Sequence, residues 1–196
     1  MRALVARAVA ESINQVVDQD DRPAAGDAKP PLADAVAGDA VIAVGADHGG
    51  VELKDAIAAH LSDTGYQVID CGTNGPQAVD YPDLAQAVAE KVAGGAATAG
   101  IVVDGAGIGS AMAANKVPGV RAALCYDISS ARNSREHNHA NLLTLGAGLI
   151  GRGLALQIVD AWLATPHGPG RHARRVAKIA ELERKYAANG SARGSK

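Results

Sequence analysis

The sequence predicts an α/β fold: a three-layer αβα sandwich in which helices cover both faces of a five-stranded parallel sheet. Two patterns predict it. From residue 40 onward, short apolar runs of strand length alternate with helical stretches, which is the order of βα units. The runs are apolar, as expected of strands buried on both faces. Hydrophobic residues make up 47% of the 196 residues, but the chain has one Trp, four Tyr and no Phe, which leaves Ala, Val, Ile and Leu to form the core.

The predicted elements follow in a regular order. A strand at 40–45, a helix at about 50–64 and a strand at 67–70 form the opening βαβ unit. The further strands are expected at 100–104, 120–125 and 141–146. The further helices are expected at about 82–92, after the stretch GIGSAMAANK (107–116), and at about 128–135, 151–164 and 171–187. Because ligands of such sheets bind at the carboxyl ends of the strands, the polar residues there are candidate site residues.

Two terminal regions differ from this domain, which is expected to span residues 40–187. Apolar residues recur in helical spacing over residues 1–17, which predicts a short amphipathic helix. Residues 18–39 are rich in Pro, Gly, Ala and Asp and predict a flexible linker. Residues 188–196 are expected to form a disordered tail.

The amphipathic segment 1–17 has three interpretations. A short helix with an apolar face is marginal in water by itself, so it is expected to dock on something. It is either an extra helix or tail of its own domain, a docking peptide, or an organelle transit peptide, to which Glu11 and the acidic linker are poorly suited. The layout resembles the encapsulation peptides that carry enzymes into bacterial microcompartments by binding shell or cargo proteins.

Charge and cysteine content exclude several functions. A formal net charge of -2 provides no overall field for nucleic acid or an anionic membrane, and no apolar run is long enough to span a bilayer. The two cysteines, Cys71 and Cys125, form neither a disulfide framework nor a zinc motif, which favours the reducing cytoplasm. Neither a Walker A motif nor a correctly placed dinucleotide fingerprint is present, so nucleotide chemistry is disfavoured.

Chemically active residues follow the first and third predicted strands. Asp47 and His48 stand after the first strand, before two glycines that allow a sharp turn into the helix. The third strand ends in the turn 104–110, DGAGIGS, whose backbone N–H groups can hold an anion or a developing oxyanion. These residues predict a site for proton transfer on an anionic small molecule.

Two further groups come later in the chain. His137, Asn138 and His139 lie just before the fifth strand, where an imidazole could carry a proton to or from a sugar ring oxygen. Arg171 and Arg175 are spaced i, i+4, so two guanidinium groups on one helical face could grip one phosphate. Together these residues indicate proton transfer on a phosphorylated small molecule.

The ordered motifs resemble the ribose-5-phosphate isomerase B and galactose-6-phosphate isomerase family over roughly residues 40–187. The matching segments are GADHGGVELK (45–54), VIDCGT (68–73), DYP (80–82), GIGSAMAANKVPGVRAAL (107–124), SREHNHANLLTLG (134–146), IVDAWL (158–163) and GRHARRV (170–176). The resemblance implies a Rossmann-like αβα fold, a homodimer or homotetramer with active sites between subunits, no metal and no cofactor. It implies interconversion of aldose and ketose phosphates, such as ribose 5-phosphate and ribulose 5-phosphate, through a cis-enediol.

The resemblance also implies roles for individual residues. Asp47 and His48 would contact the substrate, Tyr81 would line the site and His137 would assist ring opening. The enediolate oxygens would be steadied by Asn138 and by the backbone of Gly105, Gly107, Ile108 and Gly109. Arg171 and Arg175 would reach the phosphate from the neighbouring subunit.

This sequence departs from the family at the catalytic base. Asp104 stands where a cysteine base is usual, Ala106 replaces a threonine, and Ser110 stands where other members have a glutamate base. Gly148 replaces a phosphate-binding arginine, although Arg152 is near in sequence. The aspartate looks like that of the A subunit of galactose-6-phosphate isomerase. Two interpretations follow: Asp104 is itself the base, or the chain is a noncatalytic binding or assembly subunit that needs a cysteine-bearing paralogue.

Overall fold

The computed structural model describes the backbone of residues 40–193 and the side chains of residues 40–187. The predicted docking segment (1–17), the linker (18–39) and the last three residues lie outside the described residues.

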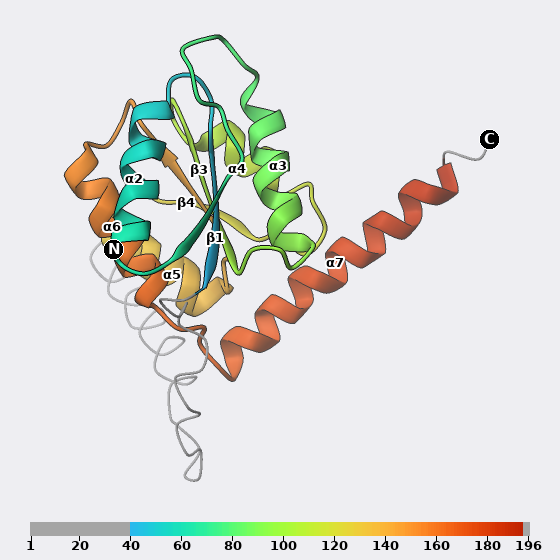
Figure 1. The fold of residues 1–196 in the computed structure, drawn as a ribbon. Coiled ribbons are helices and arrows are strands. Elements are labelled where there is room, and N and C mark those ends of the chain that lie inside the picture. The colour runs from blue at the N-terminus through green and yellow to red at the C-terminus, as the bar shows by residue number, and fades with distance from the viewer. Residues whose placement is uncertain (1–39, 194–196) are drawn as a thin grey trace, which may run out of the picture. The chain divides into compact units, whose positions relative to one another are not determined.

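One parallel sheet organises the domain and confirms the predicted fold class (Figure 1). Its strands are β1 (Val41–Ala46), β2 (Gln67–Asp70), β3 (Ala99–Asp104), β4 (Ala122–Leu124) and β5 (Leu142–Gly146). They pair in the order β2-β1-β3-β5-β4. The order reverses between β1 and β3, and such a switch point is where open α/β sheets bind ligands at the carboxyl edge.

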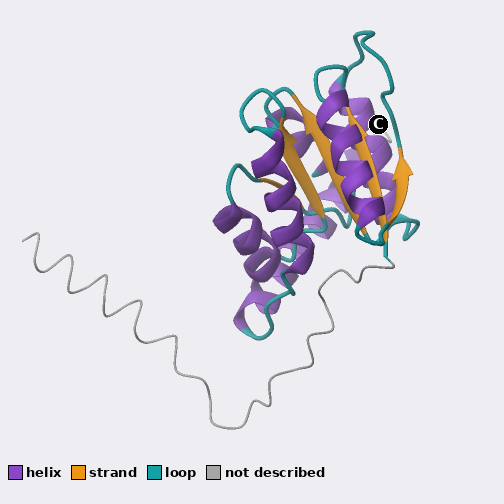
Figure 2. Cartoon of the chain, turned by 60° about the vertical axis from the view of Figure 1, so that its left-hand side comes forward, coloured by secondary structure: helices purple, strands orange, loops and turns teal. Residues whose placement is uncertain are grey.

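Helices cover both faces of the sheet (Figure 2). They are α2 (Val51–Asp63), α3 (Tyr81–Ala93), α4 (Ile108–Ala114), α5 (Ile128–Asn138), α6 (Arg152–Ala164) and α7 (Arg171–Arg193). Helices α2, α5 and α6 pack on one face, around the fully buried Trp162, and α3 and α4 pack on the other. None of the described helices is long and apolar enough to cross a bilayer.

Two elements differ from their predicted lengths. Strand β4 is shorter than expected, because the amide of Arg121 donates to the side-chain oxygen of Asn141 at 2.7 Å. Helix α7 runs beyond residue 187 to Arg193, into the predicted tail. The Glu183 carboxylate of α7 accepts hydrogen bonds from the amide of Gly119 at 3.1 and 3.0 Å, which ties this helix to the turn before β4.

A buried lysine connects α2 to the end of β2. Lys54 is 1% exposed, and its ammonium group lies 2.6 Å from Asp70 Oδ2, 2.8 Å from Asn74 Oδ1 and 3.1 Å from Asp55 Oδ1. A buried ammonium group is tolerated when its hydrogens have partners. Lys54 therefore holds the start of the loop 71–80, which leads to Tyr81 at the beginning of α3.

Replacing this lysine tests its contribution. Lys54→Met is expected to lower the free energy of unfolding by about 1–3 kcal/mol, because it removes a buried cation from two carboxylates and an amide oxygen. Urea denaturation at one fixed protein concentration measures the change. The exposed Lys91 of α3 provides the control, since Lys91→Met is expected to shift the stability by less than about 0.5 kcal/mol. Equal effects of the two variants would contradict the role given to Lys54.

Candidate functional site

The turn after β1 holds Asp47 at the carboxyl edge of the sheet. Asp47 Oδ1 accepts hydrogen bonds from the amides of Gly49 and Gly50, both at 3.0 Å, and the Asp47 amide donates to the carbonyl of Val103 at 3.2 Å. A Cβ atom at Gly50 would lie 2.5 Å from that same carbonyl oxygen. The close approach of the two backbones therefore requires glycine, and it places Asp47 directly beside the end of β3.

His48 and Tyr81 lie at the same edge. The exposed His48 accepts a long hydrogen bond at Nδ1 from the amide of Val79, at 3.4 Å, which joins the β1 turn to the loop before α3. Tyr81 begins α3, and its ring covers Gly109 so closely that a Cβ there would lie 2.5 Å from the ring. The structure thus brings His48, Tyr81 and the glycine turn to one edge of the sheet, as the resemblance implied.

The carboxylate of Asp104 lies inside the glycine turn. The side chain is buried, and Oδ1 accepts hydrogen bonds from the amides of Ala106, at 2.8 Å, and of Gly107. Oδ2 accepts from the amide of Ser110 at 3.1 Å and from the Ser110 hydroxyl. A carboxylate has about four acceptor positions. All four positions on Asp104 are filled by its own turn.

This bonding changes which amides of the turn could face a substrate. The amide of Gly107, expected to steady an enediolate oxygen, donates to Asp104 instead. Within residues 40–193, the amides of Gly105, Ile108 and Gly109 make no hydrogen bond. These three amides are therefore the backbone donors that the turn can offer to an anion.

Contacts from outside hold the turn in place. Tyr126 donates its hydroxyl hydrogen to the carbonyl of Ala106 at 2.8 Å, and the amide of Gly148 donates to the carbonyl of Gly105 at 3.0 Å. Gly107 adopts a φ of 77°, and a Cβ there would lie 2.5 Å from the side chain of Leu124. The path of the backbone is therefore set by glycine and by neighbouring elements.

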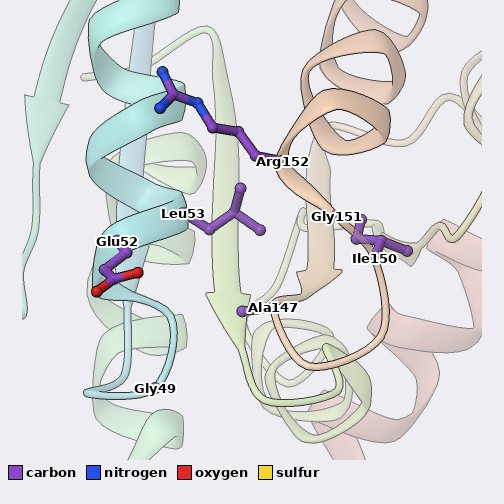
Figure 3. Close-up of a pocket in the computed structure, with 7 residues that line it drawn as sticks. All are labelled: Gly49, Glu52, Leu53, Ala147, Ile150, Gly151 and Arg152. Atoms are coloured by element: carbon purple, nitrogen blue, oxygen red, sulfur yellow. The ribbon is translucent and has the colours of Figure 1, made fainter.

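A cavity of about 310 Å³ opens beside this edge, between α2 and α6 (Figure 3). The turn after β1 contributes Gly49, and Arg152 extends from the start of α6 toward α2. The lining residues are Gly49, Glu52, Leu53, Ala147, Ile150, Gly151 and Arg152. Arg152, near Gly148 in sequence, thus lines the same cavity as Gly49, which belongs to the turn that carries Asp47 and His48.

The remaining predicted site residues lie at the opposite edge. Helix α5 starts after β4 and ends with His137 and Asn138, just before β5 begins at Leu142. The carbonyl of His139 accepts a hydrogen bond from Nε of Arg121, which precedes β4. One strand of five residues spans about 16 Å. A single chain therefore does not bring His137 and Asn138 to Asp47 and Asp104.

Helix α7 begins beside His137. The amide of Gly168 donates to the carbonyl of Glu136 at 2.8 Å, and the rings of His137 and His172 stack with centroids 4.2 Å apart. Burial lowers the pKa of His172, and proximity to His137, Arg171 and Arg175 lowers it further against an opposing effect of Glu136, so its neutral form is favoured. Arg171 and Arg175, one turn apart at the start of α7, therefore belong to the same edge as His137.

Neither cysteine is placed to substitute for the usual base. Burial raises the pKa of the Cys71 thiol, and this effect exceeds the lowering by Lys91, while Asp70 and Lys54 have still smaller and opposite effects. Burial likewise raises the pKa of Cys125. Both thiols therefore favour the protonated, weakly nucleophilic form. Within the described residues, no cluster of three or more His, Cys, Asp or Glu side chains could hold a metal ion.

Sequence reasoning missed two features that the geometry shows. The first is that His137 and Asn138 lie with Arg171 and Arg175 at the other edge, since the resemblance had assigned only the two arginines to the neighbouring subunit. The antiparallel course of a helix between parallel strands indicates this position. The second is Asn133, whose amide nitrogen lies 2.8 Å from Nδ1 of His137. Its i, i+4 spacing to His137 is the signal that could have revealed it.

Comparisons with known proteins show to which family the chain is similar. The family model described as Ribose/Galactose Isomerase matches residues 42–179. Ribose-5-phosphate isomerase B of Escherichia coli is 46% identical over 144 residues, which cover 74% of this chain and 97% of that protein. The putative sugar phosphate isomerase YwlF of Bacillus subtilis is 44% identical over 145 residues, with the same coverage of each chain.

Solved structures extend the likeness to three dimensions. Ribose-5-phosphate isomerase B of Clostridium thermocellum is 54% identical, with a TM-score of 0.74 over 74% of this chain and 99% of that one. The Mycoplasma genitalium enzyme with bound ribulose-5-phosphate is 40% identical, with a TM-score of 0.72 over 74% of this chain and 96% of that one. The chain therefore belongs to the ribose/galactose isomerase family.

Proposed function

We propose that the chain is an aldose–ketose isomerase that interconverts ribose 5-phosphate and ribulose 5-phosphate, or a related short pair of sugar phosphates. The observation that carries this proposal is the 46% identity to a ribose-5-phosphate isomerase B over 97% of its length. Asp47, His48 and Tyr81 gather at the switch-point edge, where α/β sheets bind small molecules. The proposed chemistry needs neither metal nor cofactor.

The proposed reaction has two stages. His137 first assists opening of the sugar ring, and Arg171 and Arg175 hold the phosphate. A base then removes the proton from C2, which forms a cis-enediol, and returns the proton to C1 while the C2 hydroxyl proton leaves for the new O1 hydroxyl. The amides of Gly105, Ile108 and Gly109, with Asn138, are the proposed donors to the enediolate oxygens.

Asp104 is the proposed base, and its hydrogen bonds define what this role requires. All four acceptor positions of the carboxylate are filled, so it can take a proton only after one donor turns away. The Ser110 hydroxyl is the donor that can rotate without moving the backbone. Oδ2 of Asp104 is therefore the proposed proton-accepting atom.

Assay of the purified full chain tests this proposal. Conversion of ribose 5-phosphate to ribulose 5-phosphate is expected, and Asp104→Asn is expected to reduce kcat at least about 100-fold because a carboxamide cannot accept the C2 proton. Cys71→Ser, which removes the half-buried thiol that follows β2, is the control and is expected to retain activity. Absence of turnover with every pentose, tetrose and hexose phosphate would refute the proposal.

The filled acceptor positions of Asp104 favour a second candidate function. In this alternative the chain is a noncatalytic sugar-phosphate-binding or assembly subunit, and a cysteine-bearing paralogue supplies the base. Calorimetry would then show binding of ribose 5-phosphate to the isolated chain without turnover. Activity would appear when the paralogue is mixed in, and Asp104→Asn would leave that activity unchanged.

The separation of the site residues supports an assembly of two or more copies, a homodimer or homotetramer. His137, Asn138, Arg171 and Arg175 lie at the edge of the sheet opposite to Asp47, so a second copy must supply one of the two groups. Helix α7 also exposes Ile179, Leu182 and Tyr186, an apolar row that a second copy would cover. Each active site is thus proposed to combine residues of two chains.

Hybrid assemblies test the shared site. Asp47→Asn and His137→Asn are each expected to abolish most activity when purified alone. Co-expression of the two variants is expected to restore about one quarter of the wild-type activity, because half of the dimers are hybrids and each hybrid contains one intact site. A site contained within one chain would show no recovery.

For residues 1–17 we propose docking to a microcompartment shell or cargo protein, which would place the enzyme in the cytoplasm, inside such a compartment. The match to the family model begins at residue 42, so this segment is additional to the region shared with the relatives. The amphipathic pattern followed by a flexible linker supports a docking role.

Deletion of residues 1–38 tests the docking segment. The truncated chain is expected to keep its unfolding midpoint, its oligomeric state and its kcat, since the match to the family model begins at residue 42. It is expected to lose co-purification with shell or cargo proteins. Misfolding of the truncated chain would show instead that the segment packs into the core.

A further inference from the structure

Two neighbours hold the imidazole of His137. On its edge, the amide nitrogen of Asn133, one turn earlier on α5, lies 2.8 Å from Nδ1. On its face, the ring of His172 stacks at 4.2 Å between centroids with an interplanar angle of 11°. These two contacts fix the plane of the ring and one of its nitrogens. The ring is half-buried, and part of it remains accessible.

The contact with Asn133 determines where the ring proton resides. An amide nitrogen carries only hydrogens to donate, so Nδ1 of His137 must accept through its lone pair. In a neutral imidazole the proton is then on Nε2. The nearest carboxylate oxygen, Glu136 Oε2, is 4.0 Å from Nε2, which is too far for a hydrogen bond. Nε2–H is therefore not engaged by Glu136.

We propose that Asn133 is a positioning residue that keeps His137 as the Nε2–H tautomer, so that Nε2–H is the hydrogen-bond donor to the sugar ring oxygen during ring opening. This rests on the proposed isomerase function. Nε2–H donates its hydrogen bond to the ring oxygen O4 as the C1–O4 bond breaks and negative charge develops on O4. Solvent water takes the proton of the anomeric hydroxyl as the C1=O bond forms and delivers a proton to O4. The imidazole stays neutral, and Nδ1 stays unprotonated throughout.

His172 supports the same arrangement from the other side of the ring. Its imidazole is predominantly neutral, because burial and the neighbouring positive charges lower its pKa. A neutral ring can stack on His137 without charge repulsion. Asn133 then selects the nitrogen that carries the proton, and His172 fixes the plane in which that proton points.

Nitrogen-15 NMR of the full chain tests the tautomer without any assay of activity. The His137 signals are identified by their loss in His137→Gln, and the wild type is expected to show the Nε2–H pattern. Asn133→Leu, of similar shape but without a donor, is expected to give a mixture of tautomers. Asn133→Asp is expected to move the proton to Nδ1, since a carboxylate accepts rather than donates. The signals of His60, which bonds Asp160 at 2.6 Å, serve as an internal reference and should not move.

Kinetics then connect the tautomer to the reaction. Asn133→Leu is expected to lower kcat with ribose 5-phosphate about fivefold and to change KM less than about twofold, because Asn133 acts through His137 and touches no substrate. The matched control is Gln86→Leu, which removes the i, i+4 side-chain hydrogen bond of Gln86 to Glu90 on α3 and should leave kcat and the His137 signals unchanged.

The outcomes separate this inference from the proposed function. An unchanged His137 pattern in Asn133→Leu overturns the inference, whether or not the chain is active. A changed pattern with wild-type kcat also overturns it, because the contact would then serve only the helix. If Asn133→Leu changes the His137 pattern but the wild-type chain turns over no sugar phosphate, the isomerase function is refuted, and with it the role in ring opening. The control of the tautomer by Asn133 stands in that case.

Discussion

The hydrogen bonds between Asp104 and its own turn are the interaction on which the carboxyl edge depends. A buried carboxylate needs donors, and a glycine-rich turn leaves several amides without partners. The turn supplies the donors that the carboxylate needs, and the carboxylate accepts from amides that would otherwise lack partners. The donors belong to Ala106, Gly107 and Ser110. The same bonds decide which amides remain for a substrate and what must move before Asp104 can accept a proton.

The helices impose a second constraint. In a parallel sheet each helix returns the chain to the amino edge, so residues at the end of a helix cannot meet residues at the end of a strand in the same chain. His137 ends α5 and Asp47 follows β1, and a strand length lies between their edges. The proposed isomerase reaction uses both groups, so the proposal requires a second copy of the chain, and the exposed apolar row of α7 offers a surface for such an assembly.

Much of the fold could be predicted from the sequence, because buried parallel strands are recognisable as short apolar runs between helices. The prediction differed from the structure in the lengths of two elements. Strand β4 is short because the Asn141 side chain replaces a ladder contact. Helix α7 continues because nothing in residues 188–193 interrupts it. The grouping of Asp47 and His48 with the glycine turn followed from the rule on carboxyl ends, whereas the place of Tyr81 came from the family resemblance. The inward turn of the Asp104 side chain did not, since it depends on a side-chain rotamer and on turn geometry. The pairing of Asn133 with His137 was readable from i, i+4 spacing, but only once His137 had a role.

The glycine turn has a consequence for how such an enzyme can change. Its backbone path depends partly on the left-handed Gly107 and on contacts from Tyr126 and Gly148. It depends also on the Asp104 carboxylate, which holds the amides of Ala106, Gly107 and Ser110. The scaffold and the proposed base are thus encoded in part by the same residue. A side chain at 104 that accepts fewer hydrogen bonds would free these amides for a substrate while it changes the acid. An exchange at this one codon would therefore alter proton transfer and anion binding together.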